Sequence, residues 1–242
     1  MLKIFRKVRQ NMIKKNKVTT YLLYAIGEIA LVMIGILLAL QVNNWNEKRV
    51  QKNQLNSILK TVALDLETDT LVAGTIIKHY EDNQKNSQRI INKEINRENY
   101  KDCPQCANLI TVYRPFNIQT KGFNLLTNFS DNNTVKTDSL VTNITQFYPS
   151  IMGLIEDSNG FIKNEVLSNI ESFKEYNWFV DWTQGNINQD MIYYLTESED
   201  YRKRVAAHDL LAAKNHLLFV SLFKQGATNL LEKINKRLET VD

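Results

Sequence analysis

The feature that most constrains this chain is an apolar run of 22 residues, 21-YLLYAIGEIALVMIGILLALQV-42. As a helix, a run of this length spans about 33 Å, enough to cross a hydrocarbon core of about 30 Å. It is longer than the apolar region of a signal peptide, and no small-residue cleavage pattern follows it. Tyr21 and Tyr24 at one end and Trp45 beyond the other suit the two membrane interfaces. We therefore expect residues 21–42 to form a permanent transmembrane helix.

Basic side chains are distributed unequally on the two sides of this run. Residues 1–20 contain seven Lys and Arg and no acidic residue, whereas residues 43–62 contain four basic side chains and one acidic side chain. The more basic flank of a membrane helix usually stays in the cytoplasm. Residues 1–20 are therefore expected to form a basic cytoplasmic tail, with residues 43–242 across the membrane.

The net charge of the chain reflects this tail. The whole sequence carries a formal charge of +4, and since the tail contributes +7 and Glu28 contributes −1, residues 43–242 sum to −2. A basic surface that would attract nucleic-acid phosphates is not expected outside the tail. We expect no nucleic-acid partner.

Helical spacing is the recurring signal beyond the membrane run. Side chains at steps of three and four residues, over about seven turns, predict one face of an amphipathic helix or coiled coil. They are Leu55, Leu59, Val62, Leu66, Thr70, Ala73, Ile77 and Tyr80. Neither Gly nor Pro lies between residue 42 and this face. We predict an all-α fold in which the single N-terminal transmembrane helix continues into an antiparallel helical bundle at residues 43–242.

The remaining segments are less regular. Residues 97–122 break the helical pattern and predict a long connection, with a short strand at 109–113 as an alternative. Asp138 or Ser139 is expected to cap a short helix, and Pro149 to start a longer one. The last long helix is expected to open at 197-ESED-200, with 217-LLFVSLF-223 apolar nearly all round and buried.

Two stretches carry a family resemblance. The run 24-YAIGEIALVMIGILLALQVNNWNE-47, preceded by 1-MLKIFRKVRQ-10, resembles the signature of the DUF6090 family, uncharacterised single-pass proteins of Bacteroidota. The pattern 121-KGFNLLTNFSDNNTVKTDSLVTNITQFY-148 is similar to that family's middle region. The resemblance implies an inner-membrane protein of a Gram-negative envelope whose bundle is periplasmic. It implies no established activity.

Glu28 is the one charged residue inside the apolar run. On a helix it shares a face with Gly35 and Ala39, and this Gly-x-x-x-Ala spacing lets a second helix approach closely. Because an intramembrane carboxylate usually faces protein or water, the leading interpretation is helix–helix packing or oligomerisation through Glu28, Gly35 and Ala39. Two alternatives stay open. Glu28 is protonated or reaches a tail lysine at the surface, or it handles protons.

The proton alternative has a layout in its favour. A short basic tail, one membrane helix with an acid in its cytoplasmic half and a periplasmic domain are similar to the small subunits of proton-driven motors of the ExbD and MotB kind. Such a protein would be a transducing subunit driven by the proton-motive force, and it would need a polytopic partner. The analogy rests on layout alone, because the predicted helical bundle does not resemble the periplasmic domains of those subunits.

The two cysteines form a single motif, 103-CPQC-106. The motif lies between polar residues, without the strand and helix of a thioredoxin-like site, so a local disulfide between Cys103 and Cys106 is the leading interpretation. Redox chemistry and a metal site remain alternatives. A zinc site would need two more ligands, and the three histidines, His79, His208 and His216, show no ligand-pair spacing.

These features favour a non-enzymatic membrane protein over an enzyme. No phosphate loop, paired carboxylates or nucleophile–base order stands out, and we expect no cofactor and no metal. The bundle is expected to act as a scaffold or partner-binding module in the cell envelope, as a homo-oligomer or with another envelope protein. A periplasmic ligand-sensing bundle is a further alternative, to which the aromatic cluster at Trp178, Phe179 and Trp182 would contribute.

Overall fold

The computed structural model describes residues 18–132 and 138–240, and within them every regular element is a helix. The chain divides into two units, residues 1–55 and residues 56–242. Most of the predicted basic tail, residues 1–17, lies outside the described residues. The prediction of an all-helical protein with one long apolar N-terminal helix is confirmed.

Helix α2 (Val18–Ile91) is an uninterrupted helix of 74 residues. The large apolar side chains from Leu22 to Val50 lie on the surface, Leu31 being 74 % exposed. By length and composition, this is one helix that can cross a membrane. The expected continuation of the helix through Trp45 is also found, because no Gly or Pro interrupts the backbone hydrogen bonding there.

In the second unit α2 buries the face that the spacing predicted. Leu59, Val62, Leu66, Ala73 and Tyr80 are buried, and Ile76 takes the place expected for Ile77, which is half-buried. The step from Ala73 to Ile76 is three residues and the step to Tyr80 is four, so Ile76 keeps to the buried stripe more closely than Ile77 does.

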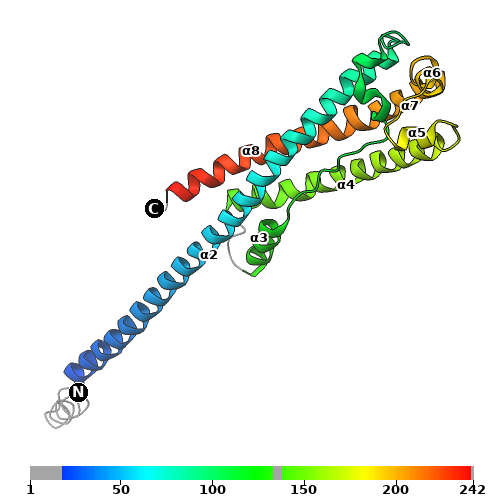
Figure 1. The fold of residues 1–242 in the computed structure, drawn as a ribbon. Helices are drawn as coiled ribbons and strands as arrows, with labels where there is room; N and C mark the ends of the chain where they lie inside the picture. Colours follow the sequence, from blue (N-terminus) through cyan, green and yellow to red (C-terminus); the bar gives the residue numbers. More distant parts are fainter. Residues whose placement is uncertain (1–17, 133–137, 241–242) are drawn as a thin grey trace. The chain divides into compact units, whose positions relative to one another are not determined.

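After α2 the chain makes two short 3₁₀ helices, η1 (Tyr100–Asp102) and η2 (Pro104–Asn108), and then an extended stretch. We call residues 112–120 the strap (Figure 1). The alternative of a strand at 109–113 is wrong, because none of the described segments pairs with the strap through its backbone. Side chains bind its backbone instead.

Three side-chain anchors hold the strap. The Tyr80 hydroxyl accepts a hydrogen bond from Arg114 N (2.9 Å) and donates one to Arg114 O (3.2 Å). The Asn159 amide bonds both the N–H and the C=O of Phe116, at 3.1 and 2.7 Å. Asp69, on α2, accepts from Gln119 N at 2.9 Å. The strap thereby satisfies buried backbone groups without a sheet.

Helix α3 (Lys121–Asn132) was not anticipated from the sequence. Its start is fixed by the buried carboxylate of Asp65 on α2, which accepts from Gly122 N at 2.6 Å. A donor near a helix N-terminus is thus satisfied by a distant residue instead of a local cap. A Cβ at Gly122 would lie 2.6 Å from the backbone of Val62, so only glycine permits this approach.

Helix α4 (Ser139–Phe173) runs through Pro149, so the expected division into a short and a long helix is wrong. Its buried residues continue at steps of three and four across the proline, with Tyr148 and Ile151 on either side. This continuous packing outweighs the cost of about 3 kcal/mol for an interior proline. The expected cap is present, since Asp138 accepts from Leu140 N and Val141 N and pairs with Arg237.

The C-terminal part begins with α5 (Phe179–Thr183) and α6 (Gln189–Glu197), two short helices that were not predicted. Helix α7 (Glu199–Asp209) follows, its N-terminus capped by Ser198, close to the expected start. A π-helical segment, η4 (Leu210–His216), joins it to α8 (Leu217–Glu239). The burial expected for 217-LLFVSLF-223 is only partial: Leu218 and Leu222 are exposed because α8 packs through one face, toward α4 (Figure 1).

Candidate functional site

The intramembrane face predicted from Glu28, Gly35 and Ala39 lies on the exposed surface of α2. A Cβ added at Gly35 would meet nothing within 4 Å, so no described segment of the same chain occupies this face. Packing through Glu28, Gly35 and Ala39 stays a prediction.

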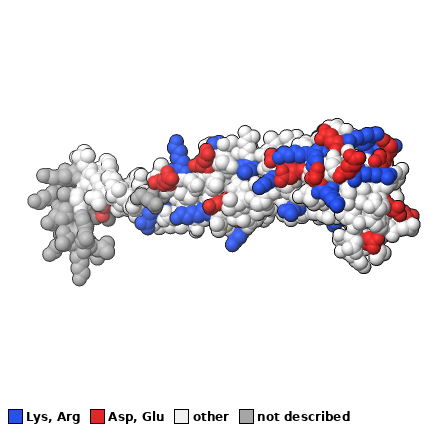
Figure 2. Space-filling view, turned by 45° about the horizontal axis from the view of Figure 1, so that its top comes forward, with Lys and Arg blue, Asp and Glu red and all other residues white. Residues whose placement is uncertain are grey.

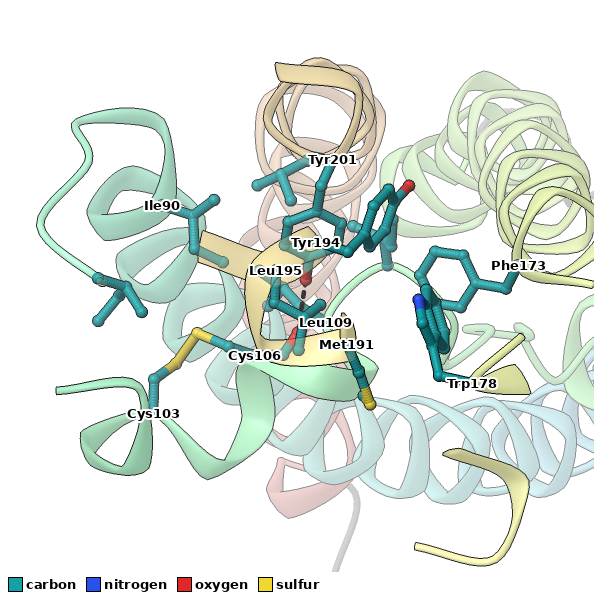
Figure 3. Close-up of a cluster of buried hydrophobic side chains, with 13 residues drawn as sticks. Ile90, Cys103, Cys106, Leu109, Phe173, Trp178, Met191, Tyr194, Leu195 and Tyr201 are labelled. Carbon is teal, nitrogen blue, oxygen red and sulfur yellow. Dashed lines mark hydrogen bonds between the residues drawn. A yellow bond between two sulfur atoms is a disulfide. The ribbon is translucent and has the colours of Figure 1, made fainter. Parts of the chain in front are cut away.

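Cys103 and Cys106 are joined by a disulfide with a Cα–Cα distance of 5.3 Å, and both are buried. They belong to an apolar cluster with residues of α2, α4, α6 and α7, among them Ile90, Phe173 and Leu195 (Figure 3). The Tyr201 hydroxyl donates to Cys106 O within this cluster. The disulfide is therefore buried and links Cys103, which lies between η1 and η2, to Cys106 within η2.

The aromatic residues near 180 mostly pack a corner. Trp178 is buried and stacks on Tyr176, and its ring meets Phe173 edge-on at 5.1 Å. Trp182 donates its indole N–H to Ala107 O at 3.1 Å. These contacts tie α5 to η2, so the two tryptophans serve packing in this structure.

A polar cleft of about 590 Å³ opens beside η2 and the strap. Its lining combines apolar surface from Pro104, Leu109 and Val112 with eight polar or charged residues: His79, Asp82, Asn83, Lys85, Asn86, Gln105, Asn108 and Arg114. Both charge signs are present, and amides supply donors and acceptors. The lining suits a small polar molecule better than an apolar one.

The three histidines of the chain lie near one another at this cleft, which His79 lines, although His79 is distant in sequence from the other two. The ring of Tyr80 meets the ring of His79 at 5.0 Å and the ring of His216 at 5.1 Å. His208, in the last turn of α7, and His216, the last residue of η4, are fully buried. We call His79, His208 and His216 the histidine cluster.

The cluster is poorly supplied with hydrogen bonds. His216 Nδ1 bonds Ser158 Oγ at 2.8 Å, whereas neither ring nitrogen of His208 has a partner among the described residues. Asp209 accepts from Gln88 through one oxygen, and its other oxygen has none. Among the described residues, no group of His, Cys, Asp or Glu is arranged to hold a metal ion.

Burial sets the charge state of these groups. Burial, with a smaller contribution from the nearby His79, lowers the pKa of His208 to about 4. Burial also lowers the pKa of His216 to about 4, against an opposing effect of the Arg114 backbone. The pKa of Asp209 is raised, again mainly by burial. At neutral pH the imidazoles are therefore uncharged.

Sequence reasoning missed both the cleft and the cluster. His208 and His216 stand eight apart on what reads as one helix, a spacing that carries no ligand signal. Their meeting with His79 depends on the packing of η4 against α2. The only local signal was the polarity of residues 82–86 beside a buried helical face.

Comparisons with known proteins returned no match: no family model fits the chain, and no curated protein and no solved structure is detectably similar to it. The resemblance to the DUF6090 family therefore stays a prediction from the residues quoted above.

Proposed function

We propose that this chain is a non-enzymatic single-pass membrane protein, of the DUF6090 type, whose helical part is a scaffold or partner-binding module of the cell envelope. In this proposal residues 21–42 cross the inner membrane, the N-terminus is cytoplasmic and residues 43–242 form an antiparallel bundle in the periplasm. One observation carries it: a single helix, α2, contains both an exposed apolar segment of membrane length and a face of the folded core.

Contacts along α2 support the antiparallel arrangement. Going up α2, Gly74 lies beside Lys224, Tyr80 contacts His216 and Gln88 bonds Asp209. The partner positions fall as the α2 positions rise, as expected for helices that run in opposite directions.

The exposed face at Gly35 supports association. An apolar helix surface that none of the described residues covers is suited to contact with lipid or with another protein. Glu28 on the same face favours protein, because burying a carboxylate in lipid costs about 2.5–3.5 kcal/mol on insertion scales. We therefore expect a homo-oligomer or a complex with an envelope protein.

The test is native mass spectrometry of the full-length protein, purified in mild detergent from its own membranes. Gly35→Leu is expected to weaken a detergent-stable complex, because the larger side chain separates the helices. Gly27→Leu is the matched control, since Gly27 points about 100° away from Glu28 on the helix. A complex that survives Gly35→Leu unchanged would rule out the packing face. A wild-type monomer would argue against the scaffold itself.

The polar cleft favours a second candidate, a ligand-sensing bundle. Its volume of about 590 Å³ is within the range of small-molecule sites, and its side chains supply hydrogen-bond donors and acceptors. A panel of small polar compounds should then include one that raises the unfolding temperature of the full-length protein. Filling the cleft by Asn86→Trp should abolish that stabilisation, whereas the same change at the exposed Asn164 on α4 should preserve it. Equal loss in both variants would count against the cleft.

A further inference from the structure

The histidine cluster occupies an unusual place in the fold. It lies at a π-helical segment, η4. The π-helix is a rare conformation that is frequently found at functional sites. His208 lies in the last turn of α7, two residues before this segment. His216 is the last residue of the segment, and His79 comes from α2. All the imidazole groups of the chain are thus gathered around one irregular turn.

The polar atoms in this region are left without the partners that buried groups usually have. Both nitrogens of His208, Nε2 of His79, one oxygen of Asp209 and Ser87 Oγ make no hydrogen bond with any described residue. His208 and Ser87 are 0 and 1 % exposed. Native proteins keep few such groups, and a cluster of them calls for an explanation.

We propose that the histidine cluster is an acid-sensitive switch, in which neutral imidazoles let η4 pack closely against α2 and α4, and protonation below about pH 6 opens this packing. An imidazolium at His208 would be a buried charge with no partner, beside a second histidine that becomes cationic in the same pH range. Opening relieves both problems by admitting water.

The structure connects this event to the strap and the cleft. Tyr80, whose ring contacts His79 and His216, also holds both backbone groups of Arg114. Arg114 and His79 line the polar cleft. A displaced η4 would therefore loosen the strap anchor and change the wall of the cleft.

The direction of the pH effect follows from proton counting. In the unfolded chain a histidine has a pKa near 6.5, whereas the folded chain keeps His208 and His216 at about 4. Between these values the unfolded or opened form binds more protons, so the stability of the closed form falls as the pH falls. Each histidine that is shifted in this way raises the opening constant about tenfold per pH unit within that window.

Other charged groups around the cluster modify this response. Asp82 on α2 favours charged His79, and Arg114 on the strap disfavours it. Asp209, the last residue of α7, faces Lys214 of η4, and burial raises its pKa. A carboxyl with a raised folded-state pKa adds stability at low pH and loses it as the pH rises, which opposes the histidines. The contribution of the histidines must therefore be isolated by substitution.

The experiment is equilibrium unfolding of the full chain in detergent micelles between pH 7.5 and pH 4.5. We compare the wild type with His208→Leu, which removes the titrating group and fills similar space. Ser87→Ala is the matched control, because it removes a buried unpartnered oxygen that does not titrate. We expect the unfolding constant of His208→Leu to rise about tenfold less per pH unit of acidification than that of the wild type. Ser87→Ala should change the unfolding constant by the same factor at every pH.

Parallel stability curves for wild type and His208→Leu would overturn the switch. Should His208→Leu not fold, the ring signals of the three histidines in the wild-type NMR spectrum decide. The switch requires that His208 stay neutral at pH 5.5 while the chain is folded, and that hydrogen exchange of residues 205–220 accelerate below pH 6 beyond the intrinsic change. A His208 ring that titrates near 6.5 in the folded chain would overturn it.

Discussion

Asn159 on α4 does the work that a neighbouring strand does in a sheet. Its amide group donates to Phe116 O and accepts from Phe116 N, so it bonds the strap as a peptide group would. Phe116 itself is fully buried against Phe223 on α8. The two hydrogen bonds from Asn159 therefore hold the middle of the strap at the position where Phe116 packs into the core.

This geometry yields a residue-scale prediction. Asn159→Ala leaves two buried backbone groups of Phe116 without partners and should lower the free energy of unfolding by about 2–4 kcal/mol. Asn164→Ala, at an exposed position of the same helix, should change it by less than about 0.5 kcal/mol. Denaturant unfolding of the full chain in micelles measures both. Equal small effects would mean that water replaces the lost hydrogen bonds.

At the scale of elements, the close approach of α3 to α2 depends on one glycine. The backbone of Val62 stands where a Cβ of residue 122 would be. Gly122 N also donates to Asp65, so α3 cannot shift away without losing that hydrogen bond. The position of α3 is thus fixed by a steric limit and a polar anchor together.

Two glycine substitutions should therefore change the stability of the fold in opposite directions. Gly122→Ala is expected to destabilise the fold by about 1–3 kcal/mol, because α3 must move or the backbone must strain. Gly160→Ala, in the interior of α4 with nothing within 4 Å of the new Cβ, should stabilise it by up to about 1 kcal/mol. Thermal unfolding of both variants measures the contrast. A neutral Gly122→Ala would show that α3 is loosely held.

The sequence predicts elements well where one face repeats over many turns. The buried stripe of α2 was found in this way. The cap at Asp138, predicted as Asp138 or Ser139, and the helix start predicted at 197-ESED-200 were found from local residues, because they depend on neighbours in the chain. The division at Pro149 was wrong because a local rule was applied where tertiary packing decides.

What the sequence did not predict depends on distant residues. Helix α3 begins at an anchor 57 positions earlier in the chain, Asp65. The strap has no periodicity because its partners are side chains. The cleft and the histidine cluster form only when η4 lies against α2. The disulfide, by contrast, joins neighbours in the sequence, where spacing is informative.

At the scale of the whole molecule, charged side chains of both signs are mixed on the surface (Figure 2), whereas exposed apolar side chains are concentrated in residues 22–42. On the face shown in Figure 2, Lys and Arg side chains alternate with Asp and Glu, without a large area of one sign. The exposed apolar side chains of residues 22–42 form a continuous sequence with Glu28 as its only charge. A surface of mixed charge is stable in contact with water, whereas a continuous apolar segment is not.

This contrast predicts how the protein partitions. The full-length chain should remain in the membrane pellet after extraction with alkaline carbonate, because residues 21–42 are embedded in lipid. A chain of residues 46–242, which keeps all of the second unit, should be soluble and show the helical circular dichroism of a folded protein. Release of the full-length chain by carbonate would contradict a membrane-spanning helix.

The way the strap is held has a consequence for how this sequence can vary. Its three anchors bind backbone N–H groups, which every amino acid except proline provides. Apart from Phe116, whose side chain is in the core, and Gln119, whose amide also bonds Asp69, strap residues can be exchanged for residues other than proline with little effect on its path. The information that specifies this path is stored elsewhere, in Tyr80, Asn159 and Asp69. In related chains we would expect the amino-acid sequence of the strap to vary more than the residues at Tyr80, Asn159 and Asp69.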